Sequence, residues 1–457
     1  MSLKQQIQLD EIYLIQAYKR KPVEFVRGDG IRLYDDTGKE YLDFFSGAGA
    51  VSVGHSNPAV TQAIQQQAAK LLHVSNYYYV EGRGELAEKV SKLLNAGPGD
   101  VAVEQGSPAT PDAPATTVTP ATPAVPGTPA TTAIPAIPAT PATPATPATP
   151  WKFFFANSGA EAIEGAIKLA RKYGSTQLGG ASTIISARRS FHGRTLAALA
   201  ATGQPSKQES FKPLPPGFVH TDINDIEGLK ALLGEGTQGE KPTEKGVCAV
   251  LLECIQGEGG VNPCTEEYLR EVRRLTEERR ILLIIDEVQT GFYRTGTYPF
   301  AFQHAGIKPD VVTLAKGLGA GFPIGAFAAL GLAAEVLQPG DHGSTFGGSP
   351  LAIAAASAAL SELEKMNAAI HVAEVGAYLK EQLQTLPLVT EVRGRGLMVG
   401  IELSEPVAEQ AVGEGLNAGL VLNNIGLTTL RFLPPLVCSK ADVDVLTERL
   451  KTILEKK

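Results

Sequence analysis

The feature that most restricts the fold of this chain is a series of unbroken apolar runs, each followed by a charged residue. Residues 247–252 lead to Glu253, and residues 281–285 lead to Asp286. A charged amphipathic segment, 266–279, lies between them and reads as a helix. Apolar strands that alternate with helices predict a parallel sheet covered on both faces. Polar residues that follow such strands should gather at one edge of the sheet, where α/β proteins bind ligands.

Two of these strand ends fit the chemistry of one cofactor. Asp286 follows one apolar run, and Lys316 follows a second run at residues 311–315. Pyridoxal phosphate requires a lysine amine for its Schiff base and an acid partner for its pyridinium nitrogen. The alternative is a structural role for both residues, with Asp286 capping a helix and Lys316 at a surface turn. This stretch alone leaves both interpretations open.

Length and composition limit the class of protein. A chain of 457 residues can form two or three domains, and a net charge of −7 argues against nucleic acid or an anionic membrane as the main partner. The four cysteines form no Cys-x-x-Cys pair, which fits a reducing cytosol, and we expect no metal site. Residues 1–20 lack a signal peptide's apolar core, and no run is long enough to span a membrane. We therefore expect a soluble cytoplasmic protein.

The composition changes abruptly between residues 97 and 150, where Pro, Ala, Thr, Gly and Val dominate. From Pro135 to Pro150 a proline recurs at every third position, mostly as Pro-Ala-Thr. Proline at this period excludes a helix and blocks the hydrogen bonds of a sheet, so we expect polyproline II or disorder. We interpret the segment as an inserted surface loop. A proline-rich docking site for a partner protein is the alternative.

A phosphate-binding turn is predicted directly after this segment. The apolar strand 151–156 leads into Asn157, Ser158, Gly159 and Ala160, which open a helix. The amides at a helix N-terminus and the positive end of the helix dipole attract anions, and Ser158 adds a hydroxyl. An ordinary serine N-cap is the alternative.

A further strand, 183–186, leads to two candidate ligand contacts. Phe191 could stack on a flat ring, and Arg194 could bind a carboxylate. A core phenylalanine and a surface arginine would explain the same residues, and in isolation this stretch favours that simpler explanation.

The two ends of the chain predict a second, smaller domain. Residues 24–46 contain short alternating runs separated by Gly and Asp, which indicates a β-meander. The C-terminal part alternates helices and strands in an α+β pattern. We therefore predict a large domain over residues 55–335 and a small α+β domain built from residues 1–54 and 336–457.

Taken in order, the motifs resemble those of the class III, fold type I pyridoxal-phosphate aminotransferases. The matching stretches are residues 157–162 (NSGAEA), 191–195 (FHGRT), 256–260 (QGEGG), 286–291 (DEVQTG), 294–296 (RTG), 315–319 (AKGLG), 343–348 (GSTFGG) and 430–432 (LRF). The resemblance covers the chain apart from the Pro-Ala-Thr segment. It implies an α/β fold with a mostly parallel central sheet in the large domain and pyridoxal 5′-phosphate as cofactor.

The resemblance also implies roles for the cofactor-binding residues. Lys316 matches the Schiff-base lysine and proton-transfer base, and Asp286 matches the partner of the pyridine nitrogen. Phe191 would stack on the ring, and Gln289 would bond its ring oxygen. The remaining residues would bind phosphate, and they are Ser158, Gly159 and Ala160 with Thr345 from the neighbouring subunit of a homodimer.

Substrate carboxylates are expected to meet two arginines. Arg194 and Arg431 match the family's carboxylate-binding residues, since a guanidinium can bind a carboxylate through two parallel hydrogen bonds. Glu258 resembles a gate that pairs with Arg431 while the amine donor is bound and releases it for 2-oxoglutarate. Ser344 is expected to contribute to substrate binding.

Three stretches favour the members that act on the terminal amine of N2-acetyl-L-ornithine. They are residues 75–79 (SNYYY), 322–326 (FPIGA) and 393–398 (RGRGLM). The alternatives are ornithine, succinylornithine or 4-aminobutyrate as donor, a mutase or epimerase with the same cofactor, and a non-catalytic scaffold with a proline-rich arm. Ile163, Cys254 and Ser349 depart from the usual family residues, and they put the donor in question more than the reaction type.

Overall fold

The computed structural model describes residues 2–97, 149–234 and 246–457. Nearly all of the Pro-Ala-Thr segment, predicted as an inserted loop in polyproline II or disorder, lies outside the described residues. None of the helices in the described ranges is both long and apolar enough to cross a lipid bilayer.

A seven-stranded sheet forms the centre of the molecule, in the order β4-β12-β11-β10-β7-β5-β6. All of its strands run parallel except β12, which is antiparallel to both of its neighbours. The bounds are β4 Lys152–Ala156, β5 Thr183–Ala187, β6 Phe218–Thr221, β7 Val247–Leu252, β10 Leu282–Asp286, β11 Val311–Leu314 and β12 Gly325–Ala329. The predicted, mostly parallel sheet is confirmed.

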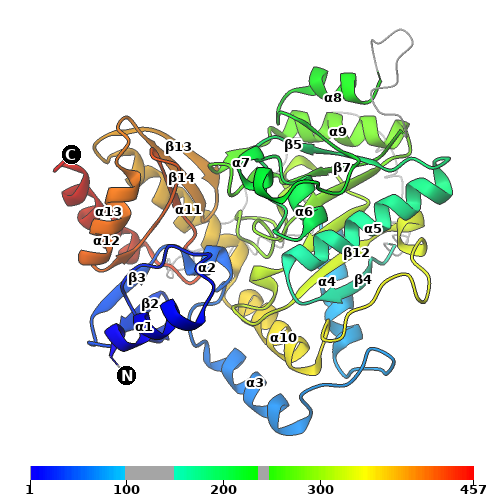
Figure 1. Cartoon of the computed structure of the whole chain (residues 1–457). Coiled ribbons are helices and arrows are strands. Elements are labelled where there is room, and N and C mark those ends of the chain that lie inside the picture. Colours follow the sequence, from blue (N-terminus) through cyan, green and yellow to red (C-terminus); the bar gives the residue numbers. More distant parts are fainter. Residues whose placement is uncertain (1, 98–148, 235–245) are drawn as a thin grey trace, which may run out of the picture.

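Helices cover both faces of this sheet, as the unbroken apolar runs predicted. Successive residues of β10 point to opposite faces, so Leu282 and Ile284 join one hydrophobic cluster while Leu283 and Ile285 join another. The first cluster contains the buried side of α5 (Gly159–Gln177). The second contains the buried side of α9 (Glu266–Glu278) and residues of α4 (Arg83–Asn95) and α10 (Pro350–Lys365). Figure 1 shows α5 and α9 beside the strands that they cover.

The N-terminal strands and the C-terminal part of the chain come together beside the large sheet (Figure 1). β1 (Phe25–Asp29), β2 (Arg32–Asp35) and β3 (Glu40–Asp43) form the predicted meander, and β15 (Leu420–Val421) adds to β3 in parallel. This pairing explains why both termini contribute to one smaller α+β unit.

A second small sheet has the order β13-β14-β17-β16. Its strands are β13 Val389–Arg395, β14 Met398–Leu403, β16 Asn423–Ile425 and β17 Thr429–Phe432, and the helices nearby include α11 Ala368–Gln384 and α13 Lys440–Leu454. The fold class is therefore the predicted α/β fold with an additional α+β part. The exact division at residues 54 and 335 stays a prediction.

Candidate active site

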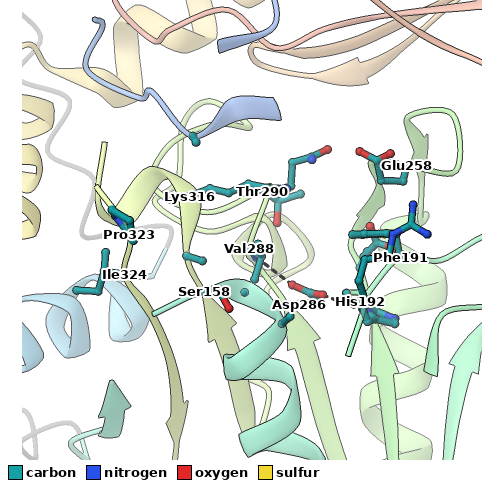
Figure 2. Close-up of a pocket in the computed structure, with 18 of the residues that line it drawn as sticks. Ser158, Phe191, His192, Glu258, Asp286, Val288, Thr290, Lys316, Pro323 and Ile324 are labelled. Carbon is teal, nitrogen blue, oxygen red and sulfur yellow. Dashed lines mark hydrogen bonds and ion pairs between the residues drawn. The ribbon is translucent and has the colours of Figure 1, made fainter. Parts of the chain in front are cut away.

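A cavity of about 420 Å³ opens where the parallel strands of the large sheet end. Its lining includes residues 157–160 after β4, 191–194 after β5, Glu253 after β7, Asp286 and residues 288–290 at the end of β10, and 315–316 after β11. The polar residues that follow the apolar strands therefore lie together around one cavity. Figure 2 shows several of these side chains facing the same space.

Asp286 is the last residue of β10 and lies at the floor of the cavity, almost fully buried. Its Oδ1 accepts hydrogen bonds from the Val288 amide (3.0 Å) and the Thr313 hydroxyl (3.1 Å). Thr313 is its direct neighbour on the parallel strand β11. The other carboxylate oxygen of Asp286, Oδ2, lies 2.8 Å from Nδ1 of His192, a contact drawn in Figure 2. These three contacts hold the Asp286 carboxylate in one orientation, because hydrogen bonds to a carboxylate oxygen are directional.

Lys316 follows β11 and starts a short 3₁₀ turn with φ of +43°. Positive φ is unfavourable for a residue with a side chain, and such strain persists only where the surroundings impose it. The lysine lines the cavity and is partly accessible as a whole, but its amine lies deep among protein atoms. Burial therefore lowers the pKa of Lys316 to about 8, although the charge of Glu258 works in the opposite direction.

The phosphate-binding turn forms at the N-terminus of α5. Ser158 caps this helix, with its hydroxyl accepting a hydrogen bond from the Glu161 amide (3.2 Å). The amides of Gly159 and Ala160 have no carbonyl one turn earlier in the helix, so they are available to an anion. The start of β12 packs tightly against this turn. Gly325 leaves no room for a side chain there, since a Cβ at this position would lie 2.3 Å from the Ser158 carbonyl oxygen. This close approach brings the loop after Lys316 next to the turn.

Glu253 lies next to Phe191, at the edge of the sheet where it was expected, although no specific role was predicted for it. Its carboxylate accepts hydrogen bonds from the amides of Phe191 (3.0 Å) and Gly257 (3.1 Å). Burial raises the pKa of Glu253 to about 7, despite the nearby His192. The only sequence signal was its place directly after an apolar strand.

Sequence reasoning missed His192, which binds Asp286 from a position 94 residues away. Its side chain is fully buried, and its Nε2 has no hydrogen-bond partner among the described residues. The histidine followed Phe191 in a recognised motif. Nothing in the sequence spacing showed that it would face Asp286.

Arg431 and Glu258 form an ion pair between the two parts of the molecule. Arg431 lies on β17 of the smaller sheet, is 2% exposed, and its Nη1 donates to Glu258 Oε1 at 2.7 Å. Its Nε donates to Asn423, and Nη1 also lies 3.5 Å from Gln289 Oε1. Burial opposes the charge on Glu258, but Arg431 outweighs it and holds the pKa of this carboxyl below its usual range.

The predicted residues divide into those at the cavity and those beside it. Arg194 lines the cavity and approaches the ring of Phe191, with its Cζ 5.6 Å from the ring centre. Ser344 lies at the edge, where its hydroxyl accepts a hydrogen bond from the Asn157 side chain (3.3 Å). Thr345 is exposed and is absent from the cavity lining. The remaining predicted residues except Arg431 line the cavity, and they are Ser158, Gly159, Ala160, Phe191, Glu258, Asp286, Gln289 and Lys316. Arg431 is absent from the lining, but it contacts two residues that belong to it, Glu258 and Gln289.

The residues present fit pyridoxal phosphate. Lys316 offers an amine with a lowered pKa that makes no hydrogen bond or ion pair in the part of the chain that the structure describes. A fixed carboxylate, Asp286, and the free amides at the start of α5 line the same cavity. An amine, an acid for a ring nitrogen and an anion site are the three groups that this cofactor requires.

The family follows from comparison with known proteins. The model of the class-III aminotransferase family matches residues 14–119 and 124–454. This chain belongs to the class-III aminotransferases. It is therefore a pyridoxal-phosphate-dependent transaminase, which confirms the predicted reaction type and cofactor.

Individual relatives and solved structures match nearly the whole length of this class-III aminotransferase. An acetylornithine aminotransferase of Aquifex aeolicus is 42% identical over 97% of this chain and 100% of its own length. One from Methanocaldococcus jannaschii is 40% identical, with 99% and 98% covered. The crystal structure of acetylornithine aminotransferase from Elizabethkingia anophelis superposes with a TM-score of 0.77 at 27% identity, covering 100% of both chains. The crystal structure of the ornithine aminotransferase from Toxoplasma gondii ME49 superposes with a TM-score of 0.81 at 27% identity, and the match covers 100% of this chain and 97% of that chain.

Proposed function

We propose that this transaminase moves the terminal amino group of N2-acetyl-L-ornithine to 2-oxoglutarate, giving N-acetyl-L-glutamate 5-semialdehyde and L-glutamate, a step of arginine biosynthesis. One observation carries the choice of donor: relatives at 40–43% identity over almost the whole chain are named acetylornithine aminotransferase. The solved ornithine aminotransferases are 26–28% identical. Ornithine is therefore the main competing donor.

Seven residues of this chain are proposed to hold the cofactor, which takes up the amino group and delocalises the electron pair left by C–H bond cleavage. Asp286 holds a proton on the pyridine nitrogen through Oδ2 or Oδ1, and its hydrogen bonds to Thr313 and Val288 keep it in position. Lys316 is the covalent attachment point. The other five residues bind the ring or the phosphate, and they are Ser158, Gly159, Ala160, Phe191 and Gln289.

Lys316 Nζ is the proposed base that removes the proton from the amine-bearing carbon of the donor. A base must be unprotonated to accept a proton, and a pKa of about 8 leaves about one tenth of the amine neutral at pH 7. An unperturbed lysine would be neutral in less than about one part in a thousand. Burial of the amine thus supports this role.

The two arginines are proposed to bind carboxylates at opposite ends of the substrate. Arg194 lines the cavity and makes no ion pair among the described residues, so it is available to the carboxylate far from the reacting amine. Arg431 is neutralised by Glu258 at 2.7 Å. With a donor whose reacting end lacks a carboxylate, the pair stays closed. With 2-oxoglutarate, Glu258 moves away and Arg431 receives the carboxylate next to the keto group.

The proposed homodimer would complete the site. Thr345 is exposed and lies outside the cavity of its own chain, which suits a phosphate contact made to a second copy. Exposed apolar residues in this loop and in the segment 72–79, which contacts it, add to the argument, and they are Leu72, Tyr77, Tyr79 and Phe346. We also propose a cytoplasmic location, on the composition of the chain.

A panel of amine donors tests the function. Purified enzyme loaded with pyridoxal phosphate is incubated with 2-oxoglutarate and one donor, and the glutamate formed is measured. The donors are N2-acetylornithine, ornithine, succinylornithine and 4-aminobutyrate. We expect the highest kcat/KM for N2-acetylornithine. A higher value for any other donor would replace the proposed substrate, and glutamate from none of them would refute the function.

A further inference from the structure

Lys207 is a cation beside the candidate active site to which no role has been assigned above. It lies on the four-residue helix α7 (Pro205–Gln208), and its Nζ is 5.5 Å from the ring centre of Phe191. Arg194 reaches the same ring with its Cζ at 5.6 Å. Phe191 and Glu258 lie on the same side of the cavity, away from Ile324 (Figure 2). Two cations therefore lie near the Phe191 ring, of which Arg194 lines the cavity and Lys207 stands behind the lining residues.

The position of Lys207 is fixed by its neighbours. The Gln204 side chain donates to the Ser190 carbonyl at 3.0 Å, and its oxygen accepts a hydrogen bond from Lys207 Nζ. Gln208, on the other side, donates to the Thr202 carbonyl at 2.7 Å. The short helix is thus tied to the end of β5, and the lysine stem is half-buried. A lysine held in this way loses less conformational entropy on binding than a free surface lysine.

The charges near the Phe191 ring are unbalanced. Arg431 is paired with Glu258, whereas neither Arg194 nor Lys207 forms an ion pair with a carboxylate among the described residues. Burial lowers the pKa of Lys207, Glu258 opposes this shift, and Arg194 and Arg431 add to it. Three cations, Lys207, Arg194 and Arg431, thus face two carboxylates in this neighbourhood, Glu258 and Glu253. A ligand carboxylate can balance the remaining positive charge.

We propose that Lys207 is a specificity-determining residue that, together with Arg194, selects donors whose far end carries a carboxylate and no ammonium group. This inference rests on the proposed function, in which Arg194 binds the carboxylate far from the reacting amine. Free ornithine brings a positive α-ammonium to the same place, and two cations there repel it. Acylation of that nitrogen removes the charge and the repulsion. The chemical class selected is the Nα-acylated diamino acids.

The test compares two donors that differ only in acylation. The ratio of kcat/KM for N2-acetylornithine to kcat/KM for ornithine is measured in the loaded wild-type enzyme, Lys207→Met and Lys207→Arg. We expect Lys207→Met to lower this ratio at least tenfold, or about 1.4 kcal/mol, through KM. Lys207→Arg should keep the ratio within about threefold, since the charge remains. Lys212→Met, which removes an exposed lysine outside the site, is the matched control.

A binding measurement separates this inference from the proposed function. N-acetyl-L-norvaline has the acylated end of the donor but no terminal amine, so its affinity does not depend on turnover. Lys207→Met should weaken its binding at least tenfold in calorimetry on the loaded enzyme. An unchanged affinity and an unchanged ratio overturn the role of Lys207 while glutamate formation still supports the function. If wild-type enzyme forms no glutamate from N2-acetylornithine, the function fails, and the binding comparison alone decides on Lys207.

Discussion

Replacement of Lys316 by Met should stabilise the cofactor-free protein at neutral pH. The lysine has a pKa of about 8 in the folded protein, against 10.5 without perturbation. Each unit of pKa difference corresponds to about 1.36 kcal/mol. The charged amine at pH 7 therefore destabilises the folded state by about 3 kcal/mol. Met is unbranched and of similar length, so it can occupy the same space without a charge.

The sign of the pH dependence follows from proton binding. Between pH 8 and pH 10.5 the unfolded chain holds a proton on this lysine and the folded protein does not, so wild-type stability rises with pH in this window. The penalty is fully present below pH 8. The advantage of Lys316→Met should thus shrink from about 3 kcal/mol at pH 7 to about half of that at pH 9.5.

Urea unfolding at both pH values measures this difference. The cofactor is removed first, because a lysine bound to it no longer titrates, and all variants are compared at one protein concentration. Lys212→Met is the control, and it should show the same stability difference at pH 7 and pH 9.5. A difference between wild type and Lys316→Met that does not change with pH would refute the reasoning that burial prepares this amine for catalysis.

Three further predictions test other parts of the site. Arg431→Met should slow the single-turnover half-reaction with 2-oxoglutarate at least about 30-fold, since truncating one partner of a buried charge pair costs about 2–5 kcal/mol. An equal loss of rate in the donor half-reaction would rule out the gate. His192→Leu removes a hydrogen bond to a buried carboxylate worth about 1.5–3 kcal/mol, so kcat should fall about tenfold to hundredfold with a changed pH profile, and an unchanged kcat would show that the contact is only structural. Mixing inactive Lys316→Ala subunits with impaired Thr345→Ala subunits should restore activity if Thr345 serves the partner's site. One site of each mixed dimer then has both Lys316 and Thr345. No gain in activity on mixing would place Thr345 in the site of its own subunit.

The sequence predicted those parts of the site that depend on strand ends. Asp286 and Lys316 each follow an apolar run, and neighbouring parallel strands bring such ends to one edge. The pairing of β10 with β11 then puts Thr313 opposite Asp286, a detail that requires the register of the sheet. Position after a strand thus indicated where these two groups lie, while their roles came from the family resemblance.

Contacts between distant elements could not be predicted in this way. Arg431 and Glu258 are 173 residues apart, and Glu258 lies in a turn outside the sheet that contains Arg431, so their proximity was known only through the family resemblance. The approach of His192 to Asp286 depends on how the loop after β5 turns back. The positive φ of Lys316 could not be predicted from the sequence either, because glycine, and not lysine, is the residue that indicates such a backbone conformation.

The most direct test of the central claim follows the transferred nitrogen. N2-acetylornithine labelled with ¹⁵N at its terminal amine is incubated with 2-oxoglutarate and the loaded enzyme, and mass spectrometry locates the label. We predict that the ¹⁵N appears in glutamate in step with loss of the donor, and that Lys316→Ala lowers the rate at least about 10³-fold. Label that stays in the donor or is released as ammonia, or a Lys316→Ala enzyme that still transfers it at the wild-type rate, would contradict the account.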